Sequence, residues 1–303
     1  MTTTTVARAD NVWKRFGPHD ALRGLNLALP EGSAYALIGP NGAGKTTTIK
    51  LLMNMLAPTR GSAMVMGVDT QRISPEVLAQ IGYVSENQAL PRRLSVGDYL
   101  DYLRPFYPSW DRALENSTRT RLQLPPNRRI GELSHGMRIK LALACALPYR
   151  PKLLILDEPF SGLDPLVREE FMEGLLLEAG EMTMLISSHE LGEIENFSTH
   201  VGFLDNGRML IEEPMDDLNQ RLREVRVTLE HPAAVPEHLP KEWLQPRAIG
   251  NVLSFVDTRY SEAALGERVR ALLGPVKRID AQPMPMRSVF TTLARAARDG
   301  AIQ

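Results

Sequence analysis

The chain has 303 residues, 43% of them apolar, which is enough for a sizeable core and indicates one large domain plus a smaller one. Its 35 basic and 36 acidic residues nearly cancel, so the charge balance gives no reason to expect a nucleic-acid partner. The single cysteine, Cys145, excludes an internal disulfide and fits a reducing compartment.

The sequence predicts neither a signal peptide nor a membrane-spanning helix. Residues 1–6 are rich in threonine and lack the basic and apolar segments of a signal peptide. No stretch approaches the roughly 18–20 apolar residues that a membrane helix needs. If the protein works at a membrane, we expect another chain to span it.

Strand and helix patterns alternate in the first part of the chain. Strands are expected at residues 6–17, 25–29, 34–38, 62–66 and 81–84. A helix is expected at residues 45–56, where Pro58 and Gly61 end the pattern. Strand patterns are absent from about residue 88 to 149, and this segment predicts a helical insertion. Its helices are expected at residues 96–106, 110–122 and 137–147.

Buried strands follow the insertion. Residues 153–157 and 182–187 are short apolar runs, with a helix expected at 165–178 between them. The Asp-Asn-Gly turn at residues 205–207 predicts a hairpin between strands at 201–204 and 208–212. This alternation predicts an α/β fold with a mostly parallel sheet, whose ligand lies at the carboxyl ends of the strands.

The chain after residue 224 has a different texture. Prolines interrupt it at positions 232, 236, 240 and 246. Strands at 252–256 and 276–279 and helices at 262–273 and 288–298 then predict a small α+β appendage. We therefore expect two domains, at residues 1–220 and 224–303.

A phosphate-loop pattern lies between a predicted strand and a predicted helix. Residues 39–46, Gly-Pro-Asn-Gly-Ala-Gly-Lys-Thr, match G-x-x-x-x-G-K-[ST] in full. Glycines let backbone N–H groups curl around phosphate oxygens, and the following helix adds its positive end. Lys45 supplies a cation for the β- and γ-phosphates, and Thr46 can ligate Mg²⁺, so ATP and Mg²⁺ are the expected cofactors. The expected nucleotide-binding residues of this segment are Gly39, Asn41, Gly42, Gly44, Lys45, Thr46 and Thr47.

Two carboxylates, Asp157 and Glu158, follow the apolar run at 153–156. Asp157 suits Mg²⁺ as a hard oxygen ligand, and Glu158 can then orient or deprotonate the attacking water. His189 ends another buried run and can donate to the γ-phosphate. Each could be a turn cap or a structural residue if it stood alone. Together with the phosphate loop they predict Lys45, Glu158 and His189 as the catalytic residues.

Over about residues 6–218 these motifs resemble the ATP-binding-cassette (ABC) ATPase family. Residues 133–137, Leu-Ser-His-Gly-Met, are similar to the family's signature, usually Leu-Ser-Gly-Gly-Gln. The resemblance implies that Ser134 and Gly136 contact the γ-phosphate held by a second subunit, in a head-to-tail dimer. It also implies a dimer-contact loop at residues 161–164, including Asp164, and a switch role for His189.

The resemblance extends to the fold and the base. It implies an α/β phosphate-loop NTPase cassette with a mostly parallel core sheet, an antiparallel β subdomain and a helical insertion, besides the α+β appendage. Phe16 lies where the family places an aromatic residue that stacks on adenine. Trp13 is the competing candidate, and core packing is the alternative for both rings.

Two segments depart from the family pattern. In the signature, His135 and Met137 replace glycine and glutamine, but the retained serine and glycine lead us to expect continued ATP use. Glu86 stands where the family usually has a glutamine that touches Mg²⁺ and water, and we expect it to be a metal ligand. Gln88 is the alternative counterpart, although Glu86 follows the apolar strand directly.

The variant signature, the turn at residues 107–111 and the appendage resemble exporter subunits that work with a separate permease, as in multidrug, peptide-antibiotic or lantibiotic export. This implies a cytoplasmic ATPase on the inner face of the cell membrane, a homodimer in the simplest case. It would meet the permease through about residues 87–106.

Two other functions remain as alternatives. One is a soluble ABC ATPase that acts on nucleic acid or ribosomes, which the lack of a second cassette, coiled coil or basic arm disfavours. The other is a regulator that binds ATP without turnover, which the retained Lys45, Asp157, Glu158 and His189 disfavour.

Overall fold

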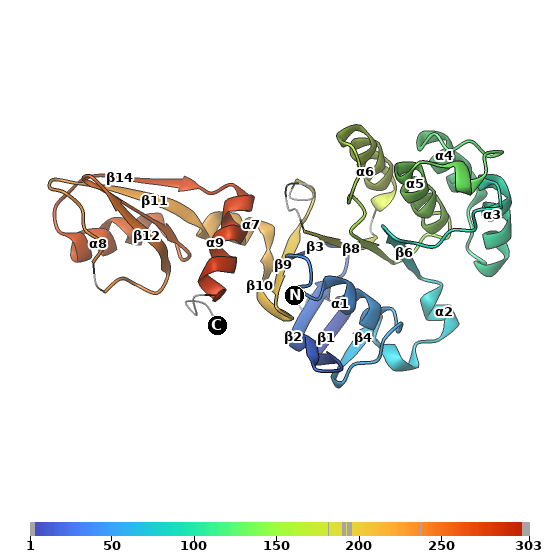
Figure 1. Ribbon diagram of the computed structural model, residues 1–303, viewed down its shortest axis with the longest axis horizontal. Helices are drawn as coiled ribbons and strands as arrows, with labels where there is room; N and C mark the ends of the chain where they lie inside the picture. The colour runs from blue at the N-terminus through green and yellow to red at the C-terminus, as the bar shows by residue number, and fades with distance from the viewer. Residues whose placement is uncertain (1–3, 181, 190–191, 193–195, 237, 299–303) are drawn as a thin grey trace. The chain divides into compact units, whose positions relative to one another are not determined.

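The computed structural model describes residues 4–180, 182–189, 192, 196–236 and 238–298 (Figure 1). The chain divides into two compact units, Met1–Met209 and Leu210–Gln303, and the division falls inside β10 (Arg208–Pro214). The predicted division into domains at residues 1–220 and 224–303 stays a prediction. Within the described part of the chain, none of the helices combines the length and the apolar character needed to cross a membrane.

The first unit is built on a six-stranded sheet with the order β10-β9-β3-β8-β7-β6. Its parallel strands are β3 (Ala34–Ile38), β6 (Ile81–Ser85), β7 (Leu153–Asp157), β8 (Thr183–Ser188) and β9 (His200–Asp205). β3, β7 and β8 are buried along their whole length, as expected of parallel strands covered on both faces. The predicted parallel core sheet is confirmed.

The predicted hairpin joins β9 to β10. Asn206 and Gly207 both have positive φ angles, 48° and 76°, which a two-residue hairpin turn of this kind requires. Gly207 N donates to Ala43 O at 2.9 Å, and Arg23 N donates to Gly207 O at 2.8 Å. The turn is therefore hydrogen-bonded to the phosphate loop at Ala43.

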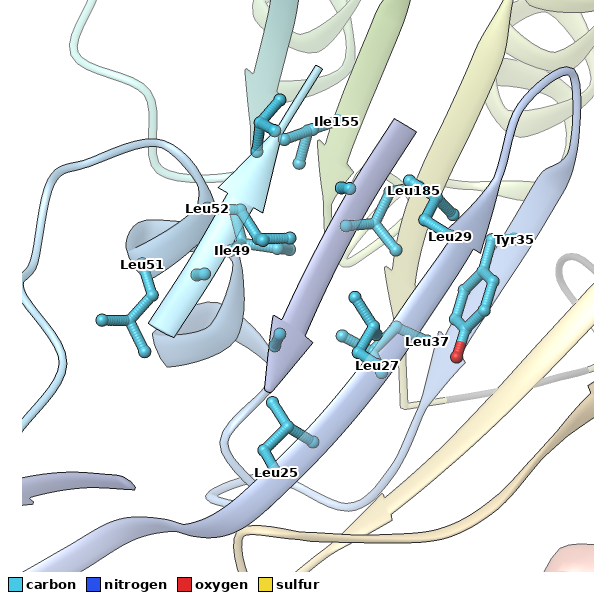
Figure 2. Packing of buried hydrophobic residues seen from close by; sticks show 14 of the residues in the cluster. Leu25, Leu27, Leu29, Tyr35, Leu37, Ile49, Leu51, Leu52, Ile155 and Leu185 are labelled. Atoms are coloured by element: carbon cyan, nitrogen blue, oxygen red, sulfur yellow. The ribbon is translucent and has the colours of Figure 1, made fainter. Parts of the chain in front are cut away.

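A four-stranded antiparallel sheet, with the order β2-β1-β4-β5, packs against this core. Its strands are β1 (Thr5–Phe16), β2 (His19–Pro30), β4 (Arg60–Val65) and β5 (Val68–Asp69). Alternate residues of β2 face inward, and Figure 2 shows Leu27 and Leu29 beside Leu37 and Leu185 in one cluster. Burying each such side chain contributes roughly 1.5–3 kcal/mol, so the cluster holds the two sheets together.

Helix α1 (Lys45–Leu52) follows the phosphate loop and packs into the same cluster through Ile49 and Leu52. It ends earlier than the predicted residue 56. Asn54 takes a left-handed conformation, with φ 53°, which the helix cannot continue through. The short helix α2 (Pro75–Leu78) precedes β6.

The predicted helical insertion is present, and its helices gather together in Figure 1. They are α3 (Val96–Leu103), α4 (Arg112–Arg121) and α5 (His135–Ala146), and α6 (Pro165–Ala179) follows β7. The predicted helix at 96–106 closes as a 3₁₀ turn at Arg104–Phe106, where Pro105 interrupts the α-helical bonding. Ser95 and Asp98 form a capping box at the start of α3, which explains where that helix begins.

The second unit is the small α+β appendage. Its antiparallel sheet has the order β12-β13-β11-β14, and its core includes the rings of Trp243 and Phe255, stacked with centroids 4.0 Å apart. The elements are α7 (Met215–Arg221), β11 (Arg223–Leu229), β12 (Trp243–Ile249), β13 (Val252–Asp257), α8 (Glu262–Leu273), β14 (Val276–Pro283) and α9 (Met286–Arg298). β12 was not predicted, because Pro246 is typical of irregular chain rather than of a strand. The structure accommodates it at a register shift between Leu244 and Arg247.

Candidate functional site

The carboxyl ends of β3, β8, β7 and β6 lie side by side at one edge of the core sheet. The register pairs Ser85 with Asp157, Asp157 with Ser187, and Ile38 with Ser188. Because β8 lies between β3 and β7, the residues that follow β8 lie between the phosphate loop and the acidic pair. The sequence motifs thus meet at one place.

The phosphate loop leaves no room for side chains at two of its glycines. A Cβ at Gly39 would lie 2.1 Å from Leu204 O, and one at Gly44 would lie 2.8 Å from Ala21 O. Gly44 also has φ 111° and provides no side-chain cap for α1, whose first turn contains no acidic residue. The first N–H groups of the helix are therefore suited to an anion.

Lys45 lies inside the curve of this loop and is only 5% exposed. Its Nζ donates to Gly39 O at 2.6 Å and lies 3.0 Å from Glu158 Oε1. The ammonium group is therefore held between the loop and the end of β7, although the two segments are far apart in the sequence.

Asp157 is buried and accepts two hydroxyl hydrogen bonds at Oδ1, from Ser187 Oγ at 2.7 Å and Thr46 Oγ1 at 3.1 Å. Burial raises the pKa of Asp157, opposed by these hydrogen bonds. Ser187 Oγ also accepts from Glu158 N at 3.0 Å. No sequence motif predicts a role for Ser187, whose only signal in the sequence is its place at the end of a buried strand.

The oxygens of Thr46 and Asp157 are of the type that Mg²⁺ takes together with nucleotide phosphates. Among the described residues, no group of three or more His, Cys, Asp or Glu side chains could hold a metal ion by itself. An ion that arrives with a nucleotide needs only one or two protein ligands, because phosphate and water complete its shell. The residues present therefore fit Mg²⁺ as part of a metal–nucleotide complex.

Glu158 has a left-handed backbone, with φ 51°, which is strained for a residue other than glycine. His189 Nδ1 lies 2.7 Å from its Oε2. Burial acts to raise the pKa of Glu158, but hydrogen bonds from His189 and Lys45 outweigh it, and the pKa is lowered. The carboxylate is consequently ionised at neutral pH, as a base must be.

Glu86 follows β6, and its backbone N donates to Asp157 O at 3.2 Å. The backbone of Glu86 therefore lies directly beside the acidic pair. Gln88, the alternative counterpart, folds back onto its own strand end, where its Oε1 accepts from Ser85 N at 3.4 Å.

The two candidate base-stacking rings differ in exposure. Phe16 is 46% exposed, with Lys14 Nζ 5.0 Å from its ring centre. Trp13 is half-buried, and its indole N–H donates to Asn11 Oδ1 at 3.2 Å. Phe16 thus offers the more accessible ring face.

Residues 22–161 match the family described as "ABC transporter". The bacitracin transport ATP-binding protein BcrA of Bacillus licheniformis is 34% identical, and the match covers 73% of each chain. The lantibiotic transport ATP-binding protein SrtF of Streptococcus pyogenes is 35% identical over 69% of this chain and 91% of its own. This chain belongs to the ABC transporter family of ATP-binding proteins.

The likeness to longer and to solved relatives agrees with this assignment. The probable multidrug ABC transporter ATP-binding protein YbhF of Escherichia coli K12 is 34% identical over 71% of this chain, and the match spans only 38% of YbhF. A solved ATP-binding subunit of an ABC transporter has a TM-score of 0.65 at 26% identity, covering 71% of this chain and 92% of its own. The predicted family, cassette fold and nucleotide binding are confirmed.

The signature of this ABC cassette forms the start of α5. Ser134 Oγ accepts from Met137 N at 3.2 Å, and a Cβ at Gly136 would lie 2.8 Å from Val167 Cγ1 of α6. Asp164 caps α6 by accepting from Val167 N at 3.0 Å. Within the described residues, no recorded hydrogen bond or ion pair joins these signature and cap residues to the phosphate loop. They form a second group of predicted site residues, separate from the phosphate loop.

Proposed function

We propose that this chain is the ATP-hydrolysing subunit of a transporter whose membrane-spanning part is a separate permease, and that the transporter is an exporter. The observation that carries the proposal is the meeting of Lys45, Asp157, Glu158 and His189 at one sheet edge. The names of BcrA, SrtF and YbhF, which refer to bacitracin, lantibiotic and multidrug transport, support export.

In this proposal the loop from Gly39 to Thr47 holds the phosphates of ATP, with Asn41, Gly42 and Gly44 shaping it and Lys45 countering the charge of the β- and γ-phosphates. Phe16 stacks on the adenine. Thr46 and Asp157, with Glu86 at the next strand end, would hold Mg²⁺, which neutralises phosphate charge when bound.

Glu158 accepts the proton of the attacking water, whose oxygen displaces ADP from the γ-phosphorus. His189 holds Glu158 through Nδ1, which leaves Nε2 to face the γ-phosphate.

The signature serves a second copy of the chain. Ser134 and Gly136 contact the γ-phosphate bound by the partner subunit, and Asp164 lies in the loop that meets it. The exposed hydroxyl of Ser134 at a helix start supports this arrangement, since helix N-termini attract phosphate. One chain carries both halves of a site, so a homodimer suffices.

The permease surface is proposed at residues 87–106. It borders a hollow of about 350 Å³ whose lining includes Gln88, Tyr99 and Leu103. Tyr102 and Phe106 expose their rings beside one another, with centroids 5.4 Å apart. Such an exposed aromatic pair fits a protein partner, and the subunit would then lie at the inner face of the cell membrane.

Glu158→Gln tests this function directly. The amide cannot accept the water's proton, so the variant should bind ATP without hydrolysing it. It should then elute as a dimer in gel filtration with ATP and Mg²⁺. Glu262→Gln, an exposed change in the appendage, is the matched control and should elute as the wild type does. A Glu158→Gln chain that hydrolyses ATP at the wild-type rate would contradict the assignment.

A further inference from the structure

His135 is the residue of the signature that differs from the family's usual glycine, and it makes a contact that glycine cannot make. Its Nε2 lies 3.2 Å from Ser161 O. A carbonyl oxygen only accepts, so Nε2 carries the proton and donates it. A Cβ at Gly162 would lie 3.8 Å from the His135 ring, so this loop passes in van der Waals range of the imidazole.

Ser161 belongs to the short segment that leads from Glu158 to the start of α6. Ser161 N donates to Glu158 O at 3.3 Å, and Leu163 N donates to Phe160 O at 3.1 Å. Leu163 is buried, which fixes the far side of the turn. The segment is thus bonded to the backbone of Glu158 at one end and to His135 in its middle.

We infer that His135 is a positioning residue that couples the two nucleotide sites of the dimer. The inference rests on the proposed function, in which Glu158 acts on the ATP of its own chain and Ser134 contacts the ATP of the partner. The bond from His135 to Ser161 joins the start of the signature helix to the segment that begins at Glu158. A shift of Glu158 on hydrolysis therefore moves Ser134 of the same chain, and the other site responds.

The bond can be removed by a residue of similar volume and by one that has no side chain. His135→Leu fills similar space but has no donor, and His135→Gly restores the usual family residue without the bond. His135→Gln keeps an amide N–H that can reach the same carbonyl. If His135 only filled space, the leucine variant would retain function better than the glutamine variant.

The experiment is steady-state ATP hydrolysis with Mg²⁺ by the full chain, fitted for kcat, KM and the Hill coefficient. The leucine and glycine variants should lose cooperativity, with a Hill coefficient that falls from near the number of sites, about 2, toward about 1. Their kcat should fall about tenfold, about 1.4 kcal/mol, while KM changes little. The glutamine variant should recover both values.

Controls separate this inference from the proposed function. His231→Leu, at an exposed position of the appendage, should leave every value unchanged. Thermal unfolding and the affinity for ATP in the absence of Mg²⁺ check that each variant is folded. Cooperative wild-type hydrolysis with an unchanged leucine variant would overturn the inference alone. A wild type that does not hydrolyse ATP would overturn both.

Discussion

Lys45 Nζ lies 3.0 Å from Glu158 Oε1, and only 5% and 17% of the two side chains are exposed. The pair links the phosphate loop after β3 to the strand end of β7, across the intervening β8. A cation and an ionised carboxylate are thereby held at the same sheet edge. The cation is suited to bind phosphate, and the carboxylate is suited to accept a proton from water. This proximity depends on the strand order.

Ser187→Ala should impair hydrolysis although no sequence motif assigns Ser187 a role. The change removes the donor to the buried Asp157 and the acceptor of the half-buried Glu158 N, and leaves both groups without that partner. We expect a loss of about 1–3 kcal/mol of stability and a kcat lowered at least about tenfold. Urea denaturation and steady-state kinetics check both, with Ser254→Ala in the appendage as the control. Wild-type kinetics in the variant would contradict this role.

Gly39→Ala and Gly42→Ala should differ sharply. A methyl group at Gly39 strikes the backbone at Leu204 O, whereas at Gly42 nothing lies within 4 Å and only φ 82° is unfavourable. We expect a loss of about 4 kcal/mol or more, or an insoluble chain, for the first and about 1–2 kcal/mol for the second. Chemical denaturation measures the difference. Equal stability of the two variants would show that the loop relaxes around the added methyl.

Asp111 should contribute stability that depends on pH. Hydrogen bonds from Leu114 N and then from Arg150 lower the pKa of Asp111, which caps α4. Since the folded pKa lies below the unfolded one, the contribution is complete above about pH 4 and is lost as the pH falls through the folded value. Unfolding of the wild type and Asp111→Asn should differ less at pH 3 than at pH 7. A difference that grows toward acid would refute this sign.

Charge reversal on the proposed permease surface should uncouple transport from hydrolysis. Arg93 is exposed within residues 87–106, and Arg93→Glu would place a negative charge there. With the permease in vesicles, we expect transport to fall at least about tenfold while the isolated subunit hydrolyses ATP normally. Arg72→Glu, exposed elsewhere in the same unit, serves as the control. If Arg93→Glu transports normally, the permease binds elsewhere.

Local patterns predicted the parts of the site that depend on local chemistry. The phosphate loop, the acidic strand end at Asp157 and the turn at Asn206 each follow from residues that are adjacent in the chain. The helix end at Asn54 was missed because asparagine adopts a left-handed conformation only in some contexts. Short-range propensity does not decide whether an asparagine continues a helix or ends it.

Contacts between distant segments could not be predicted. The hydrogen bonds of Ser187 to the acidic pair arise because β8 lies beside β7, between it and β3, an order that no single strand specifies. The bond from His135 to Ser161 joins the start of α5 to the turn that precedes α6, so the sequence could mark His135 only as a departure from the family pattern. Such contacts depend on how distant segments pack, which the spacing of apolar residues along the sequence does not predict.

The most direct test is steady-state ATP hydrolysis by the wild type, Lys45→Ala and Glu158→Gln over a range of protein concentrations. We predict wild-type turnover per chain that rises with concentration as dimers form, and losses of at least about a hundredfold in both variants. Turnover in Lys45→Ala or Glu158→Gln equal to that of the wild type would contradict the catalytic site described for this ABC cassette.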